Sequence, residues 1–174
     1  TTTVALSFFW SFRYKDDLVD PDERLCKADK KECVFSDSVK DKNDLKIRSF
    51  ISELKKQGYK VYLILDNPFG HELSPEGILE ISRDFGISAD LSENGRIELK
   101  KLEFIERRSP INKRLQTIIN DLSINAIDPI ESLCDETICI RTSKEYDYLL
   151  YKDYDHFSIQ ALVSEVEYIY QILD

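Results

Sequence analysis

An alternation of short apolar runs with segments of helical periodicity constrains the fold of this chain more than any other feature. Three apolar runs have the length of strands: residues 3–10, 60–65 and 124–127. Between them, apolar residues recur at helical spacing over residues 43–57 and 109–122. Runs without polar alternation are typical of strands buried on both faces. The pattern predicts an α/β fold with a parallel sheet and helices on both of its faces.

The predicted helices carry recognisable end signals. Gly58 directly follows the helix over residues 43–57 and is suited to the position after its C-terminus. Ser109 and Pro110 form a capping pair that predicts the start of the next helix. A last helix is predicted to open at Ser158. Its apolar residues, expected to be buried, are Leu162, Val166, Ile169, Tyr170 and Leu173.

The predicted sheet has few strands. Sheets average about five or six strands, and three would leave long unpaired edges. We therefore expect the sheet to be incomplete in this chain, and the surface beside the strand over residues 4–10 to be apolar or filled by another segment or chain. A length of 174 residues suits one domain with one core. Residues 1–174 are accordingly expected to be a single domain, and specifically its C-terminal part.

Charge and hydropathy exclude two classes of function. The net charge is −9, whereas binding to nucleic acid requires clustered Lys and Arg, so no nucleic-acid partner is expected. The apolar runs, such as residues 61–65, are far shorter than the roughly 20 residues of a membrane-spanning helix. The share of charged residues, 33%, is typical of a globular domain.

The four cysteines form two close pairs in sequence, Cys26 with Cys33 and Cys134 with Cys139. Two short-loop disulfides explain the even number, and free buried thiols or a metal site are the alternatives. Neither pair has the C-x-x-C spacing of a zinc site, and the two histidines do not fall at finger-like intervals. Disulfides would imply an oxidising compartment.

The segment with the clearest chemical meaning places Asp153 three residues before His156, just ahead of the last predicted helix. On a turn, this spacing lets the carboxylate reach Nδ1–H of the imidazole and leaves Nε2 free to accept a proton. Asp155 is adjacent to the histidine and is expected to point elsewhere, into solvent. A surface histidine before a helix is the alternative interpretation, and the other histidine, His71, is expected in a surface loop.

The C-terminal part of the chain resembles a known family. Residues 127–161 contain Asp128-Pro129, then Cys134 and Cys139, then the sequence Tyr-Lys-Asp-Tyr-Asp-His-Phe-Ser over residues 151–158. This order is similar to the end of the SGNH (GDSL-like) domain fused to membrane acyltransferase-three proteins, which O-acylate bacterial surface glycans. The apolar run ending in Trp10 is also similar to a strand of that family. At position 157, the chain has Phe where the family usually has Leu.

The resemblance implies a three-layer α/β sandwich with a parallel, flavodoxin-like sheet. It implies that Asp153 and His156 are the acid and base of a Ser-His-Asp triad, with no metal or organic cofactor. The expected activity is O-acyl transfer, in particular O-acetyl transfer, to a polysaccharide or lipopolysaccharide, or hydrolysis of such esters. The implied partners are a glycan acceptor and an acyl donor delivered by a membrane acyltransferase domain. The implied location is periplasmic or otherwise extracytoplasmic, attached to that membrane domain.

The chain departs from the family pattern at the nucleophile. No Gly-Asp-Ser or Gly-x-Ser-x-Gly is present. Ser11 lies at the end of a predicted strand, but no glycine beside it allows a tight elbow. We therefore expect the nucleophilic serine upstream of this chain. Asn67 follows another strand end and is expected to be a turn residue, with a polar lining of the site as the alternative.

Two other classes of function remain open. A glycan-binding or scaffold domain could keep this fold without catalysis, and the absence of an upstream Gly-Asp-Ser segment would favour it. An autonomous flavodoxin-like domain would require a phosphate-binding loop. The five glycines of the chain are isolated from one another, which argues against such a loop.

Overall fold

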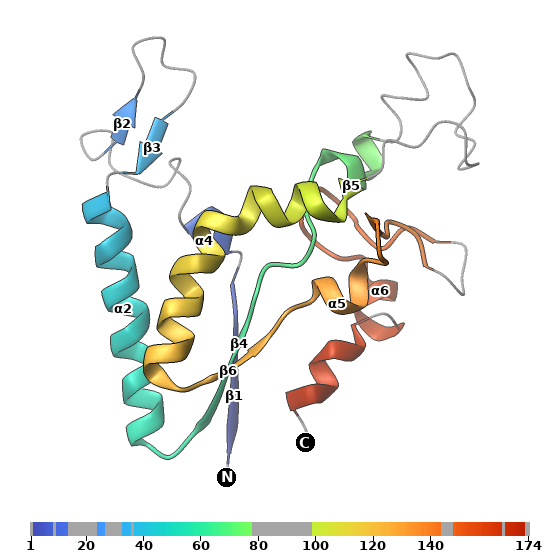
Figure 1. The fold of residues 1–174 in the computed structure, drawn as a ribbon. Coiled ribbons are helices and arrows are strands. Elements are labelled where there is room, and N and C mark those ends of the chain that lie inside the picture. The colour runs from blue at the N-terminus through green and yellow to red at the C-terminus, as the bar shows by residue number, and fades with distance from the viewer. Residues whose placement is uncertain are drawn as a thin grey trace, which may run out of the picture. The chain divides into compact units, whose positions relative to one another are not determined.

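The computed structural model describes part of the chain in detail, and the described residues are 2–8, 10–13, 24–26, 33–35, 37–77, 99–143, 148–164 and 166–172. Side chains are described in these ranges except between residues 12 and 39. The chain divides into two compact units (Figure 1). Unit 1 comprises Thr1–Asp66 and Arg108–Ile127, and unit 2 comprises Asn67–Arg107 and Asp128–Asp174.

A parallel three-stranded sheet organises unit 1. Its strands are β1 (Thr3–Ser7), β4 (Lys60–Ile64) and β6 (Asn125–Ile127), in the order β1-β4-β6. In register, Leu6 lies opposite Leu63, which in turn lies opposite Ala126. The predicted α/β fold with a parallel sheet is thereby confirmed.

Two long helices pack on the sheet of unit 1, α2 (Asp37–Lys56) and the part of α4 (Lys101–Leu122) that follows Arg108 (Figure 1). Both contribute to one apolar cluster, whose buried members are Leu6, Trp10, Ile51, Val61, Leu63, Leu65, Leu115, Ile118 and Ile119. Burying one leucine, isoleucine or valine side chain stabilises a fold by about 1.5–3 kcal/mol. Ion pairs of Arg114 with Asp44 (2.7 Å) and of Arg48 with Asp121 (2.8 Å) also join the two helices.

Strand β4 is buried on both of its faces. Val61 and Leu63 point into the helix-covered cluster, while Tyr62 and Ile64 alternate with them and are also buried. The absence of polar alternation in its sequence predicted a buried strand, and β4 is the middle strand of the order β1-β4-β6.

Strand β1 differs from its prediction. It ends at Ser7 rather than at Trp10, and Ala5 and Ser7 are exposed although a fully buried strand was predicted. The reason is its position, because β1 is an edge strand in the part of the sheet that the structure describes. A hollow of about 180 Å³ lies beside it, and its lining is mainly apolar: Leu6, Phe8, Trp10, Asn43, Lys46, Ile47 and Phe50. This agrees with the expected apolar surface beside residues 4–10.

A buried carboxylate joins the segment after β1 to the end of β4. Asp66 accepts hydrogen bonds from Trp10 N (2.6 Å), Ser11 N (2.8 Å) and Ser11 Oγ (2.6 Å). Trp10 and Ser11 begin α1 (Trp10–Arg13), and Trp10 Nε1 donates to the Ile64 carbonyl oxygen (2.6 Å). Burial raises the pKa of Asp66, while its hydrogen bonds to Ser11 and Trp10 and the charge of Arg108 act in the opposite direction.

The end of α2 matches its sequence signal, although its start does not. The helix begins at Asp37, six residues before the predicted start. At its C-terminus, Gly58 adopts a φ of 85° and donates to the Lys55 carbonyl oxygen (3.0 Å), while Tyr59 donates to that of Leu54 (3.1 Å). These two bonds satisfy helix carbonyl groups in a Schellman motif, which favours glycine at the left-handed position.

Helix α4 corrects the prediction that a helix starts at Ser109. It begins at Lys101, and Pro110 lies inside it. A proline there removes one backbone hydrogen bond, at a cost of about 3 kcal/mol. The residues before it are mostly strong helix formers, and Phe104 and Arg108 are buried, which stabilises the additional turns.

Unit 2 is built from short elements around a compact core. They include the 3₁₀ helix η3 (His71–Leu73), β5 (Leu99–Lys100), α5 (Ile130–Leu133), β7 (Ile138–Cys139), α6 (Ile159–Ser164) and the 3₁₀ helix η5 (Glu167–Ile172), and the part of α4 up to Arg107 also belongs to this unit. Strands β5 and β7 pair antiparallel. The largest fully buried side chains of the unit are Leu73, Leu99, Phe104, Leu133, Leu150 and Tyr151.

The last predicted helix is divided into α6 and η5. Val166 is buried as predicted, but Leu162, Ile169 and Tyr170 are exposed, and Leu173 lies outside the described residues. Helical spacing of 3.6 residues no longer holds once α6 ends at Ser164, so the predicted apolar stripe is interrupted. In the described residues, no helix is long and apolar enough to cross a membrane.

Candidate catalytic site

Asp153 organises the turn that carries His156. Its Oδ1 accepts hydrogen bonds from the backbone N–H groups of Asp155 (3.1 Å) and His156 (2.8 Å). Lys152 N closes the turn by donating to the His156 carbonyl oxygen (2.9 Å). An aspartate favours such a turn because its short side chain can bond the backbone two and three residues ahead. The turn therefore brings this carboxylate and the imidazole together.

The imidazole of His156 is held through Nδ1. Its distances to Asp153 Oδ1 and Oδ2 are 3.0 and 3.1 Å, and the predicted contact between these two residues is present. When Nδ1–H donates to a carboxylate, the neutral ring has its lone pair on Nε2. The His156 side chain is 64% exposed, so an external group can reach it. This arrangement suits a general base that is oriented by an acid.

The Asp153 carboxylate is strongly acidic in this turn. Burial acts to raise its pKa, but the hydrogen bonds from the His156 and Asp155 backbones and from the His156 side chain, together with an interaction of the Asp155 side chain, outweigh burial and lower the pKa to about 2. Asp153 is therefore ionised at neutral pH, as an orienting acid requires.

Asp155 contradicts its prediction. Its side chain was expected to be solvated. In the structure it is only 9% exposed, and its Oδ1 lies 2.9 Å from His156 Nδ1. The expectation came from the rule that adjacent residues on a regular element do not face each other. Residues 152–155 form a bend rather than a helix or strand, so that rule does not apply here.

Three side chains of this turn also have the composition of a metal site. The ligand atoms of Asp153, Asp155 and His156 lie within 4.8 Å of one another. Exposed acidic groups are common without a metal, and Nδ1 could bind one only after losing the proton that it shares with Asp153. Hydrogen bonding between acid and imidazole already accounts for this geometry.

The loop after β4 holds the turn from the other side within unit 2. Asn67 Nδ2 donates to the carbonyl oxygens of Pro68 (3.0 Å) and Asp155 (3.3 Å). Gly70 N donates to the Tyr154 carbonyl oxygen (2.9 Å). Asn67 was predicted to be a turn residue, with a polar lining of the site as the alternative, and its bond to the Asp155 carbonyl was not predicted. The alternative came from its place after a strand end, where α/β folds position functional groups.

Gly70 shows how closely this loop is packed. It is buried, its φ is 156°, and a Cβ at this position would lie 2.2 Å from Glu72 Oε2. A side chain there would displace Glu72, which pairs with Arg107 (3.2 Å). The space beside the Gly70 Cα is thus occupied by the Glu72 carboxylate, while the Gly70 N–H donates to the Tyr154 carbonyl oxygen of the His156 turn.

Tyr151 and Phe157 close the base of the turn. They form an isolated antiparallel bridge, and their ring centroids are 5.0 Å apart. Burial raises the pKa of Tyr151 far above its ordinary value, while an interaction with the Asn67 side chain acts in the opposite direction. The Tyr151 side chain is buried, and its ring packs against that of Phe157.

The helix after the turn begins where the sequence predicted. Ser158 Oγ accepts a hydrogen bond from Ala161 N (3.2 Å) and donates to the Leu149 carbonyl oxygen (3.0 Å), while Ser158 N donates to that of Leu150 (2.7 Å). The first bond is an N-cap. Together these bonds hold the C-terminal side of the His156 turn.

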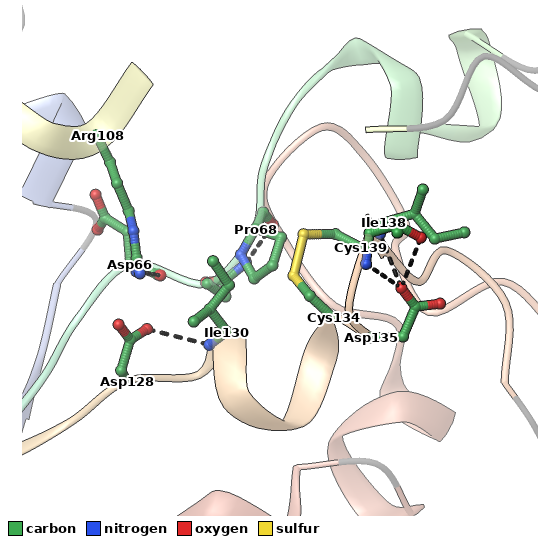
Figure 2. The surroundings of a disulfide bond; sticks show 11 residues. Asp66, Pro68, Arg108, Asp128, Ile130, Cys134, Asp135, Ile138 and Cys139 are labelled. Atoms are coloured by element: carbon green, nitrogen blue, oxygen red, sulfur yellow. Dashed lines mark hydrogen bonds between the residues drawn. A yellow bond between two sulfur atoms is a disulfide. The ribbon is translucent and has the colours of Figure 1, made fainter. Parts of the chain in front are cut away.

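A disulfide between Cys134 and Cys139, with an S–S distance of 2.03 Å, closes a turn elsewhere in unit 2 (Figure 2). Within this loop, Asp135 Oδ1 accepts hydrogen bonds from Thr137 N (2.7 Å) and Ile138 N (2.8 Å). This predicted disulfide is confirmed. The other pair lies opposite one another in the backbone register of β2 (Arg24–Cys26) and β3 (Cys33–Phe35), and its side chains lie outside the described ones.

Removing the Cys134–Cys139 bond by a Cys134→Ser/Cys139→Ser double substitution is expected to lower the free energy of unfolding by about 2 kcal/mol, because a loop this short gains little entropy when it opens. Urea denaturation of the purified protein measures this difference. The control repeats the urea denaturation of both proteins under reducing conditions. Neither protein then has the Cys134–Cys139 bond, so any remaining difference in the free energy of unfolding comes from the serine side chains. An unchanged unfolding midpoint in the oxidised comparison would contradict the expectation.

Ser11, the serine considered as a nucleophile within this chain, belongs to unit 1. It is 3% exposed, and its Oγ donates to the buried Asp66 carboxylate at 2.6 Å. That hydroxyl is committed to a structural hydrogen bond. Among the described residues, the hydrogen bonds of the His156 ring go to Asp153, and no serine takes part in them.

Comparison with known proteins identifies the family. The family model "SGNH domain (fused to AT3 domains)" matches residues 1–164. The chain belongs to this SGNH family. The predicted family resemblance is thereby confirmed, and it associates the chain with membrane acyltransferases. No curated protein and no solved structure matches the chain.

Proposed function

We propose that this SGNH domain serves in an O-acyltransferase or esterase that acts on a bacterial surface glycan. The observation that carries the proposal is the hydrogen bond between the Asp153 carboxylate and His156 Nδ1, on an exposed turn before the last helix. The family is the context for this observation, because its SGNH domains are fused to AT3 domains.

In the proposed reaction, a serine oxygen bonds to the acyl carbon of a donor ester while its proton passes to His156 Nε2. The imidazolium that forms is stabilised by Asp153, which remains ionised. The bond between the acyl carbon and the leaving oxygen then breaks, and His156 returns the proton to that oxygen. A sugar hydroxyl or water repeats the sequence in reverse and releases the acyl group from the serine.

The serine is proposed to come from a segment upstream of residue 1. Ser11 is buried and donates to Asp66, which argues against it. The exposed edge of β1 and the apolar hollow beside it offer a place where another strand of the domain can pair.

The proposed partners follow from the family and the charge. A fused membrane acyltransferase domain supplies the acyl group, and the acceptor is a polysaccharide or lipopolysaccharide. A periplasmic location is proposed because the fusion partner is a membrane protein and because the Cys134–Cys139 disulfide suits an oxidising compartment. The net charge of −9 is compatible with a polar, neutral or cationic partner and argues against nucleic acid.

Labelling of the full-length protein with a serine-directed fluorophosphonate tests the proposal. The expected result is a single modified serine in a peptide upstream of residue 1, together with loss of hydrolysis of a chromogenic acetyl ester. Modification of Ser11 would place the nucleophile in unit 1. A full-length protein that neither reacts with the reagent nor cleaves the ester would contradict catalysis and favour a glycan-binding domain of the same fold.

A further inference from the structure

We propose that Asp155 is a second acidic positioning residue for His156, a role that rests on the proposed function. Two carboxylates face one imidazole nitrogen in this turn, with Asp153 Oδ1 at 3.0 Å and Asp155 Oδ1 at 2.9 Å from Nδ1. The pair is unequal, because the Asp153 side chain is 39% exposed and that of Asp155 is 9% exposed.

Asp155 is held in place through its backbone. Its N–H donates to Asp153 Oδ1 (3.1 Å), and its carbonyl oxygen accepts from Asn67 Nδ2 (3.3 Å). The preceding carbonyl, of Tyr154, accepts from Gly70 N (2.9 Å). Bonds from a second loop thus fix the residue that carries the buried carboxylate, which an incidental surface acid would not require.

The two carboxylates can have different functions: one orients the imidazole, and the other stabilises its protonated form. Asp153 satisfies hydrogen-bond geometry toward Nδ1 and also accepts two backbone N–H groups, so it sets the turn and the tautomer. Asp155 lies equally close to Nδ1 but is better shielded from water. An ion pair is stronger where water is excluded, so Asp155 stabilises the imidazolium that forms when Nε2 takes a proton. Its contribution belongs to the transition state rather than to substrate binding.

The test is the steady-state kinetics of Asp155→Asn in the full-length protein with a chromogenic acetyl ester. The expected kcat is roughly 10- to 100-fold lower, a part of what a general base contributes, while KM remains near the wild-type value. Asp155→Glu, which keeps the carboxylate, is expected to restore most of kcat. Glu131→Gln makes the same change of charge at an exposed position of α5 and is expected to have wild-type kcat.

A double-substitution cycle separates this role from a structural one. Asp153→Asn and Asp155→Asn act on the same imidazole, so the double variant is expected to lose less than the product of the two single losses in kcat. Wild-type kcat in Asp155→Asn, or full multiplicativity in the cycle, would overturn the proposal.

Two comparisons keep the outcome interpretable. If Asp155→Asn fails to fold, the pair Asp155→Glu and Asp155→Gln replaces it, since these variants differ only in charge, and equal kcat values in the pair would overturn the proposal. His156→Ala distinguishes the two levels of inference. Activity that survives in His156→Ala contradicts the proposed function itself, whereas activity lost in His156→Ala but normal in Asp155→Asn contradicts only the role of Asp155.

Discussion

His156→Ala is expected to lower kcat of the full-length protein for a chromogenic acetyl ester by about 10⁴-fold or more, with little change in KM. The imidazole is the group proposed to take the proton from the attacking serine, and its Nδ1 lies 3.0 and 3.1 Å from the two carboxylate oxygens of Asp153. The side chain is 64% exposed, so its removal leaves no cavity in the core and the protein is expected to remain folded. Initial rates over a range of ester concentrations separate kcat from KM.

His71→Ala is the matched control, since His71 is the other histidine of the chain and is exposed. It is expected to keep wild-type kcat. Thermal unfolding of both variants by circular dichroism checks that folding is unaffected. A His156→Ala variant that retains activity within about tenfold of wild type would mean that the Asp153–His156 pair is a structural element of the turn.

The parallel sheet could be predicted from sequence because it depends on local composition. The run over residues 60–65 lacks polar alternation, which is typical of a strand covered on both faces, and β4 is such a strand. Gly58 likewise identified a helix end through the conformation that its own backbone adopts. Both signals depend on the residues themselves and on their immediate neighbours in sequence, and not on contacts with distant parts of the chain.

The predictions that failed depended on contacts between distant residues. Strand β1 has the composition of a buried strand, but how much of it is covered depends on which segment pairs with its other edge. Pro110 has the propensity of a helix start, but burial of Phe104 and Arg108 favours additional turns before it. Composition alone gives no measure of either effect.

In the candidate site too, the features set by local sequence were predictable, and those set by distant contacts were not. The Asp153–His156 contact was predictable because a spacing of three residues on a turn determines it, and the turn is made by Asp153 itself. The contribution of Asn67 was not, because its bond to the Asp155 carbonyl spans 88 residues of sequence. Asp155 was misjudged because residues 152–155 form a bend, where the rule for adjacent residues on a regular element does not apply.

Asp153→Asn gives the second large expected effect, a loss in kcat of about 10⁴-fold. The amide oxygen of asparagine can still accept the backbone N–H groups of Asp155 and His156, so the turn is expected to survive. Its NH₂ group, however, can donate to Nδ1, which favours the tautomer with the proton on Nε2 and removes the base. Asp153→Ala, which also loses the turn bonds, is the comparison, and it is expected to lower both kcat and the thermal unfolding midpoint.

The pH dependence of the free energy of unfolding measures the contribution of the Asp153 carboxylate to stability, separately from its proposed contribution to catalysis. Its pKa in the folded protein is lowered from 3.8 to about 2, so its ionised form stabilises the fold at pH values above about 4. That contribution is expected to disappear as the pH falls from about 4 towards 2, because the unfolded chain then takes up the proton first. In Asp153→Asn, this part of the acid destabilisation should be absent, which urea denaturation at a series of pH values can measure.

An Asp153→Asn variant with wild-type kcat would remove Asp153 from the triad. Combined with a low kcat in Asp155→Asn, that result would assign the acid to Asp155, whose carboxylate is the better shielded of the two.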